Sequence, residues 1–424
     1  MMSRISLIVC ALALTAGTAR SEEAPPPPPP DAVPAAPPMA EPAPPMAPPP
    51  APAWPPSVSF KNEPSSGNTL KVGLLLQPQF QALGATNLDG TSYNLYIRRT
   101  RLIVAGTLFS NFEYFFDTDY PNLFLATNEA PTATANATTS KATPGMNVQD
   151  AFATWKAWGD MIKVDVGYML PPMAHNAVQS AASLYSWDYF AFSFLSTANT
   201  LLGSTASPVG RDAGVQLRGL LLDGHLEYRL GLFQGLRATE EPAAMGGMAN
   251  TVGANNFFRA TGRLQVNLLD PETGFFYAGT YLGKKKILSI GITGDTQSSY
   301  HYYGGDVFAD LPVGPAGIFT AQVNVVHMTG GTFIALAKQT ALMSEIGFNF
   351  AGVNLSPIFR FEHLWGGTSS GGTTSNDQTH VGGGLAFWPY GHNSNIKAFY
   401  LRNSETGQPH GDNQVNVQWQ LFFL

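Results

Sequence analysis

Cysteine is almost missing from this 424-residue chain, which contains only Cys10, inside an apolar run near the N-terminus. We expect export to remove this run, so that no cysteine remains in the mature chain. Disulfides, thiolate metal sites and cysteine nucleophiles are then excluded. The lack of cysteine fits a chain that crosses an oxidising compartment unfolded.

Charge is also scarce, since charged residues make up only 12% of the chain. Two of the 23 Lys and Arg and four of the 29 Asp and Glu lie before Ser57, which leaves a net charge of about −4 for the remainder. Nucleic-acid binding requires clustered basic residues, and we expect none. After the first 20 residues, no apolar run reaches the length of about 20 residues that a transmembrane helix needs.

The N-terminal 56 residues divide into two segments. Arg4, the apolar run Ile5–Leu14 and the small residues Gly17 and Ala19 predict a cleaved signal peptide over residues 1–19; an uncleaved anchor is the alternative. Residues 20–56 form a proline-rich linker, for which we expect an extended polyproline II conformation. This linker is either a leader without a partner or a periplasmic spacer that touches peptidoglycan.

From Ser57 onward, apolar and polar residues alternate in segments of about eight to twelve residues, which is typical of β-strands. In residues 225–234, for example, Leu226, Leu230 and Leu232 fall on one face while Glu227 and Arg229 fall on the other. One side of such a strand contacts water and the other an apolar phase. Alternation alone does not decide the fold, because a soluble sandwich would pack its apolar side on a second sheet.

The number and spacing of these segments favour a membrane barrel. Sixteen strands are expected, near residues 70–80, 93–108, 111–120, 147–158, 162–170, 211–222, 225–236, 257–268, 286–296, 300–310, 317–328, 342–351, 357–365, 379–388, 395–403 and 413–424. Short turns alternate with long loops, as in outer-membrane barrels. Residues 270–286 must then be a periplasmic connection, although 275–281 look strand-like. We therefore predict an all-β, closed 16-stranded antiparallel transmembrane β-barrel over residues 57–424.

Several motifs resemble the phosphate-selective porins O and P, a family of trimeric 16-stranded outer-membrane channels. They occur in residues 98–108, 111–120, 148–156, 166–172, 210–219 and 226–235, and the C-terminal strand resembles a barrel-assembly signal shifted by one residue. The resemblance implies that residues 171–210 form a constriction loop folded into the barrel; a surface helix that caps the mouth is the alternative. It also implies anion-binding arginines and lysines along the pore.

Period-two alternation supplies the candidate pore-lining residues. The cations are Arg99, Arg101, Lys156, Lys163, Arg218, Arg229, Arg259 and Arg263. The acids are Glu113, Asp117, Asp119, Asp150, Asp165, Asp188, Asp212 and Glu227. Asp188 is the one acid of the constriction loop, which has no Lys or Arg. Such mixed rows predict only a modest ion selectivity, and the alternative role of each charge is a cross-strand ion pair in the wall.

The sequence predicts no catalytic site, metal site or cofactor. His363, Glu362 and Ser369 make the best hydrolase triad that can be assembled, and it is a weak one. The expected function is a water-filled diffusion channel for small hydrophilic solutes and ions, with inorganic anions such as phosphate as candidates. We expect a homotrimer in the outer membrane of a Gram-negative bacterium, in contact with lipid and lipopolysaccharide. The alternative is a plugged or structural barrel anchored to the cell wall.

Overall fold

The computed structural model describes residues 58–62, 67–84, 91–127, 140–141, 145–192, 210–235, 257–407 and 412–424. The expected signal peptide (1–19) and proline-rich linker (20–56) lie outside these residues. All the described residues belong to one compact unit, Ala51–Leu424.

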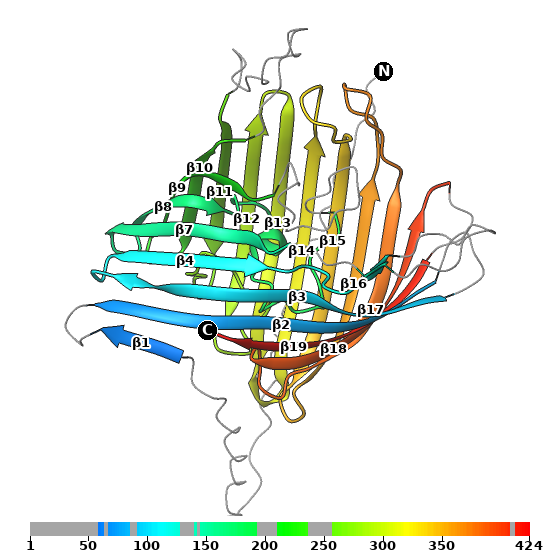
Figure 1. Ribbon diagram of the computed structural model, residues 1–424, viewed down its shortest axis with the longest axis horizontal. Coiled ribbons are helices and arrows are strands. Elements are labelled where there is room, and N and C mark those ends of the chain that lie inside the picture. The colour runs from blue at the N-terminus through cyan, green and yellow to red at the C-terminus, as the bar shows by residue number, and fades with distance from the viewer. Residues whose placement is uncertain are drawn as a thin grey trace, which may run out of the picture. The chain divides into compact units, whose positions relative to one another are not determined.

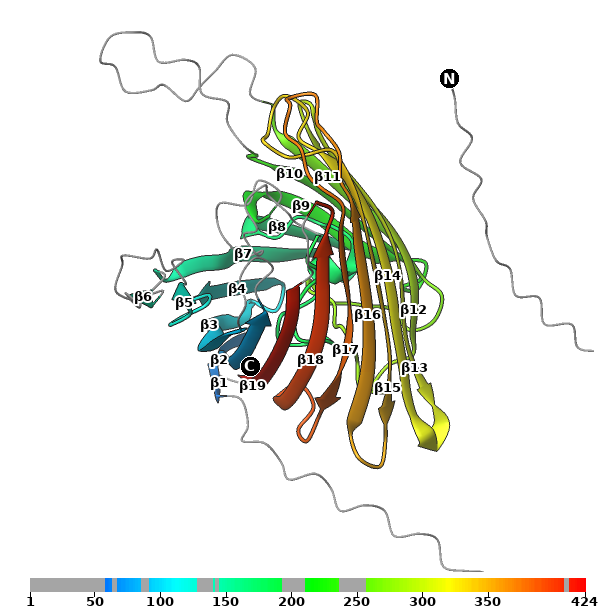
Figure 2. The ribbon, with the colours of Figure 1, turned by 90° about the vertical axis from the view of Figure 1, so that its right-hand side faces the viewer.

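Sixteen antiparallel strands form a closed ring. They are β2 (Asn68–Gly84), β3 (Thr91–Leu108), β4 (Phe112–Asp119), β7 (Asn147–Trp158), β8 (Ile162–Met169), β9 (Asp212–Leu221), β10 (Leu226–Phe233), β11 (Arg259–Asn267), β12 (Ile287–Gln297), β13 (Tyr300–Val313), β14 (Gly317–Thr329), β15 (Gln339–Phe350), β16 (Leu355–Trp365), β17 (Gln378–Phe387), β18 (Ser394–Glu405) and β19 (Asp412–Phe423). Each strand pairs with the next, and β19 pairs back with β2. Figure 2 shows this closure, with β19 in dark red beside β2 in blue. The predicted closed 16-stranded barrel is confirmed.

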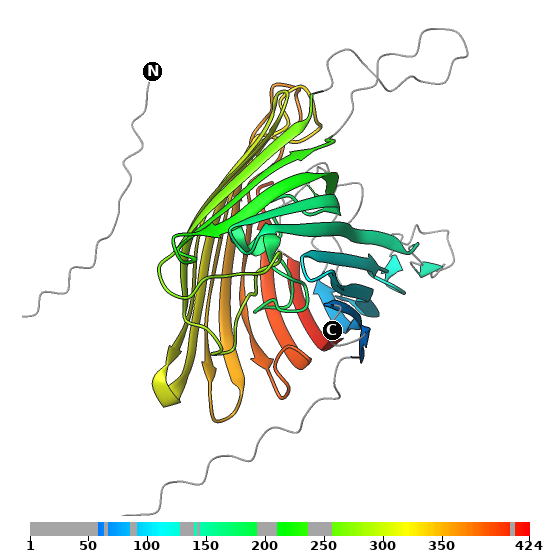
Figure 3. The same ribbon diagram turned by 90° about the vertical axis from the view of Figure 1, so that its left-hand side faces the viewer.

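The two walls of the barrel cross each other. In Figure 1, β2–β4 and β7 run across β12–β16, as expected for strands that tilt relative to a barrel axis. Figure 3 shows the green strands β8–β11, which join the two walls. Side chains alternate along every strand, so that polar residues are buried inside while Leu95, Ile292 and Leu232 are at least half exposed outside. This outward apolar surface is what a bilayer would solvate.

Exposed aromatic residues gather near both ends of the strands. Those on the side of the short turns are Phe109, Phe112, Trp155, Trp158, Phe350, Phe387 and Tyr390, and those on the opposite side are Tyr93, Phe257, Phe258, Tyr303, Trp365 and Tyr400. Aromatic girdles of this kind flank the apolar band of membrane barrels, where their rings lie at the headgroup level.

The connections divide the barrel into a turn side and a loop side. Both β2 and β19 have their outer ends on the turn side, where residues 109–111, 159–161 and 314–316 make short links. Residues 268–286 are the exception there, and they form no strand, as predicted. On the loop side one link is as short as a turn, because only Ser298 and Ser299 separate β12 from β13.

The sequence prediction missed three short strands. Ala126–Thr127 (β5) pairs with Ser140–Lys141 (β6) outside the ring. Val58–Asn62 (β1) pairs with residues 68–72 of β2. The pairing of β19 with β2 ends close to this segment, at Phe423 and Leu74. These segments are too short to show a period of two residues.

Helix is nearly absent from the described residues, where only the 3-10 turns His175–Val178 (η1) and Gly314–Ala316 (η2) occur. Neither is long or apolar enough to cross a membrane as a helix.

Candidate functional site

Residues Leu170–Phe192, here called the lumen loop, lie inside the barrel against one wall. Met173, Ala177 and Phe190 pack on inward side chains of β13–β16 and are almost fully buried. The wall residues of this cluster are Tyr300, Tyr302, Val326, Met328, Ala341, Met343 and Leu364. Burial of apolar surface holds the loop there. It therefore occupies the β13–β16 side of the lumen.

Cations of the wall fix the far end of the lumen loop. Lys397 Nζ donates hydrogen bonds to the carbonyl oxygens of Leu184 (2.7 Å) and Ser186 (2.9 Å). Arg360 Nη1 donates to Ser186 Oγ and to the Asp188 carbonyl oxygen, both at 2.6 Å. A loop inside a barrel does not pair with a neighbouring strand, so its backbone carbonyl oxygens need other hydrogen-bond donors. Lys397 and Arg360 supply them here.

Residues Asp270–Lys286, here called the lumen connection, enter from the turn side and meet the lumen loop. Tyr277 N donates to the Val178 carbonyl oxygen (3.1 Å), and Ser180 N donates to the Tyr277 carbonyl oxygen (2.9 Å). His175 Nε2 lies 2.9 Å from a carboxylate oxygen of Glu272, and both side chains are fully buried. The His175 imidazole and other donors hold the pKa of Glu272 below its usual value despite its burial.

A β-bulge directs two consecutive arginines into the lumen. The pairing of β2 with β3 shifts between Leu76 and Pro78, so that Arg98 and Arg99 lie opposite one residue, Gln77. Pro78 has no N–H to donate, which suits a bulge. Arg98 Nε and Arg99 Nη2 contact the Asp188 carboxylate at 2.9 and 2.5 Å. Burial raises the pKa of Asp188, but the two guanidinium groups outweigh this and hold it well below its usual range.

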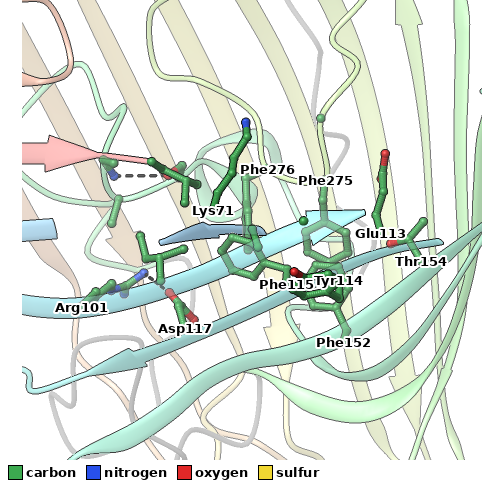
Figure 4. A pocket seen from close by; sticks show the side chains of 18 of the residues that line it. Lys71, Arg101, Glu113, Tyr114, Phe115, Asp117, Phe152, Thr154, Phe275 and Phe276 are labelled. Atoms are coloured by element: carbon green, nitrogen blue, oxygen red, sulfur yellow. Dashed lines mark hydrogen bonds and ion pairs between the residues drawn. The ribbon is translucent and has the colours of Figure 1, made fainter. Parts of the chain in front are cut away.

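A cavity of about 520 Å³ lies toward the turn side. It is bounded by β2–β4, β7–β9, residues 179–182 and Tyr189 of the lumen loop, and residues 273–276 of the lumen connection. Its charged lining side chains are Lys71, Arg101, Lys163, Arg211 and Arg218 against Glu113 and Asp117. Figure 4 shows several of them, with Phe275 and Phe276 meeting Phe115 and Phe152. Cations therefore outnumber acids on this surface.

A second cavity of about 140 Å³ lies toward the loop side, and Arg98, Asp188, Glu362 and His380 are among its lining residues. Tyr189 lines both cavities. The Asp188 carboxylate also accepts a hydrogen bond from Tyr189 N at 2.9 Å. The ion pairs of Asp188 with Arg98 and Arg99 thus lie between the two cavities, where the lumen loop meets β3.

Arg99 and Asp188 pair with each other between the two cavities. The structure places the other predicted pore-lining charges on the inward face of the strands, in two groups. Arg101, Lys163, Arg218, Glu113 and Asp117 line the larger cavity. Lys156 pairs with Glu113 at 3.1 Å, Asp165 with Arg218 at 2.8 Å, Asp150 with Arg211 at 2.9 Å, and Asp119 with Arg101 at 3.2 Å. Most members of this group are thus paired with a neighbour on the same arc of the wall.

The second group lies around β9–β13. Arg229 pairs with Glu227, Arg259 with Asp295 and Asp212, and Arg263 with Asp306. Arg229 and Arg263 lie against the Tyr277 ring of the lumen connection, with guanidinium carbons 4.6 and 5.5 Å from its centroid. None of these three arginines lines either cavity described above.

Sequence reasoning missed five cations that the structure brings to the lumen: Lys71, Arg98, Arg211, Arg360 and Lys397. The inward parity of β2 and β16 could have indicated Lys71 and Arg360. In a regular strand Arg98 and Arg99 would point to opposite faces, so only the bulge explains why Arg98 also reaches the lumen.

Glu362 and His363, from the weak triad, point to opposite faces of β16. Glu362 pairs with Arg360 and His380, and His363 forms a hydrogen bond with Thr379. No cluster of three or more metal-binding side chains occurs in the described part of the chain.

Known proteins resemble this chain in part of its sequence and in its fold. Residues 70–196 match the family model described as phosphate-selective porin O and P. The anion-selective porin from Comamonas acidovorans superposes with a TM-score of 0.52 at 12% identity, covering 84% of this chain and 100% of that one. Salmonella typhi OmpF, in complex with daunomycin, gives a TM-score of 0.49 at 12% identity, covering 84% and 98%. No curated protein sequence matches. Residues 70–196 are therefore similar to the phosphate-selective porin O and P family, and the whole barrel has the fold of a solved 16-stranded porin.

Proposed function

We propose that this protein is a porin, which conducts small hydrophilic solutes and ions along an off-centre path and moderately prefers anions. The path runs between the lumen loop and the arc of wall from β2 to β9, because the loop covers the wall from β13 to β16. The lining of the 520 Å³ cavity, five cationic side chains against two acidic ones, carries the proposal. Selectivity follows excess charge along a pore. It should be modest, because neighbouring carboxylates pair with most of these cations.

Reversal potentials across a planar bilayer under a salt gradient test the preference. The purified protein should give an anion-selective potential, and the double variant Lys71→Gln, Lys163→Gln should shift it toward cations. Lys285→Gln is the matched control, since Lys285 Nζ donates to the Pro271 carbonyl oxygen and does not line the cavity. A potential that is the same in both variants would show that the path does not pass Lys71 and Lys163.

We further propose that the protein acts as a homotrimer in the outer membrane of a Gram-negative bacterium, after export directed by residues 1–19. Lipid and lipopolysaccharide would contact the outward apolar face. Residues 20–56 would reach the peptidoglycan. Conductance that increases in steps of three supports the trimer, and pull-down of the intact chain with purified peptidoglycan, but not of a chain lacking residues 20–56, supports the last contact.

A plugged barrel is the competing function, and the ion pairs between the two cavities favour it. A chain lacking residues Ala174–Thr205 separates the two possibilities. In a porin, this deletion should increase an existing conductance several-fold, because it removes the material that narrows the lumen. In a plugged barrel, the intact protein would conduct nothing and only the deletion variant would conduct.

A further inference from the structure

Four phenylalanines form a continuous aromatic surface in the cationic cavity. The ring centroids of Phe115 and Phe152 are 5.6 Å apart, those of Phe152 and Phe275 4.3 Å, those of Phe275 and Phe276 4.8 Å, and those of Phe276 and Phe115 5.7 Å. All four line the cavity, and three of them are only partly buried. A small ligand in the cavity would therefore contact aromatic rings.

The fold holds these rings in place from two directions. Phe115 and Phe152 are direct partners in the ladder between β4 and β7, on the inward face. Phe275 belongs to the lumen connection, where Arg229 donates to the carbonyl oxygens of Gly274 (3.1 Å) and Phe275 (2.7 Å). The surface thus depends on a wall and on a segment more than 100 residues away in sequence. Its rings are fixed before any ligand enters.

Cations border the aromatic surface. The guanidinium carbon of Arg218 lies 5.4 Å from the centroid of the Phe275 ring. Lys71, which is exposed, lines the same cavity. These cations attract an inorganic anion, but the anion would lose part of its hydration shell to phenyl rings, which donate no hydrogen bond to it. An anion with an apolar body is attracted by the cations and also packs favourably on the rings.

We propose that this cavity is a binding site for aromatic carboxylates, whose ring packs on the phenylalanines while the carboxylate faces the cations. The volume of about 520 Å³ lies in the range of about 300–1,000 Å³ typical of small-molecule sites. The proposal rests on the proposed path through the lumen and names a solute class that the path would favour. Stacking of two rings contributes about 0.5–1.5 kcal/mol beyond apolar burial.

Titration calorimetry of the full chain, folded in detergent, tests this site with sodium benzoate as the probe. Benzoate should bind at least about tenfold more tightly than acetate or inorganic phosphate, since only benzoate carries a ring. The double variant Phe275→Leu, Phe276→Leu keeps an apolar surface without rings and should weaken benzoate about tenfold while acetate binding stays unchanged. Phe359→Leu, on the exposed outward face of β16, is the matched control and should bind benzoate normally.

A second variant covers the case in which the double variant does not fold. Lys71→Gln changes an exposed side chain and should weaken benzoate and acetate alike, by about threefold. Heat-dependent migration in gels reports folding of each variant. Equal affinity for benzoate and acetate, or normal benzoate binding by a folded Phe275→Leu, Phe276→Leu variant, would overturn the proposal.

Conductance of the same preparations separates this site from the proposed function. Chloride conductance without selective benzoate binding would overturn the aromatic site and leave the porin function standing. Selective benzoate binding without any conductance would support the site and overturn the diffusion path.

Discussion

Asp188 shows how one side chain can tie the lumen loop to the barrel wall. Its carboxylate joins the lumen loop to Arg98 and Arg99 of the opposite wall, and its exposed fraction is only 9%. Two buried cations balance one buried anion, so removal of the anion leaves both cations without compensation. Loss of one member of a buried pair costs more than the pair contributes, because the remaining charge stays out of water.

Asp188→Asn should lower the free energy of unfolding by about 3–5 kcal/mol and increase anion selectivity. The loop loses its ionic link to β3, and the positive charges of Arg98 and Arg99 are no longer balanced by Asp188. Urea unfolding in lipid and reversal potentials measure the two effects. Asp160→Asn is the control for stability: Asp160 pairs with Lys163 but is 67% exposed, so its loss should cost less than about 1 kcal/mol.

The difference in stability between the native protein and Asp188→Asn should also depend on pH in one direction. The lowered pKa of Asp188 means that the folded protein binds this proton less readily than the unfolded chain does. The contribution is therefore complete above the ordinary aspartate pKa of about 3.9 and is lost as the pH falls toward the lowered value. The difference should be constant from pH 8 to 5 and shrink below about pH 4. A difference that shrinks already between pH 7 and 5 would contradict this assignment.

At the scale of elements, the bulge in β3 and the lumen connection both move side chains to places that regular strands would not give them. The bulge adds Arg98 to the inward face. The connection inserts its own backbone between the wall and the lumen loop, where Gln179 and Tyr277 form a parallel bridge. The lumen therefore has two inserted segments, one from each side. Backbone hydrogen bonds at Tyr277 and Gly279 join them, and Glu272 adds a buried side-chain link to His175.

Glu272→Ala should release the lumen connection from the lumen loop. The carboxylate of Glu272 accepts hydrogen bonds from Gln265 and Tyr281 and pairs with His175, and its loss would remove one partner from each of these groups. Trypsin should then cleave after Lys284, Lys285 or Lys286 several-fold faster than in the native protein. Glu405→Ala, on the loop side, is the matched control and should leave the cleavage rate unchanged. Unchanged cleavage in Glu272→Ala would mean that other contacts hold the connection.

At the scale of the whole molecule, closure of the ring removes every free strand edge that an open sheet would have. The outward side chains then form one apolar surface, whose solvent must be a bilayer. Position along the strand sets how deep each residue lies in that bilayer. Ile292 occupies the middle of β12, whereas Val353 lies in the turn between β15 and β16, and both are 60% exposed.

Ile292→Arg should destabilise the barrel by about 2–4 kcal/mol in a bilayer, while Val353→Arg should cost at most about 1 kcal/mol. The two sites have equal exposure, so only their depth in the hydrocarbon differs. Unfolding of both variants from vesicles gives the comparison. Equal costs at the two sites would mean that water or protein, and not lipid, covers the centre of the outward face.

The sequence by itself determined the strands, their even number and the side of each strand on which a residue lies, because alternation is a local property with a period of two residues. It also placed the predicted charges on the inward face. Only the tertiary structure decided which charges reach a cavity and which are covered. Arg229 and Arg263 lie against the Tyr277 ring and line neither cavity, whereas Arg218 lies against the Phe275 ring and lines the larger one. The bulge at Arg98 and Arg99, and the partners that Asp188 and Glu272 find on distant strands, depend on contacts across the closed ring. No local pattern encodes them.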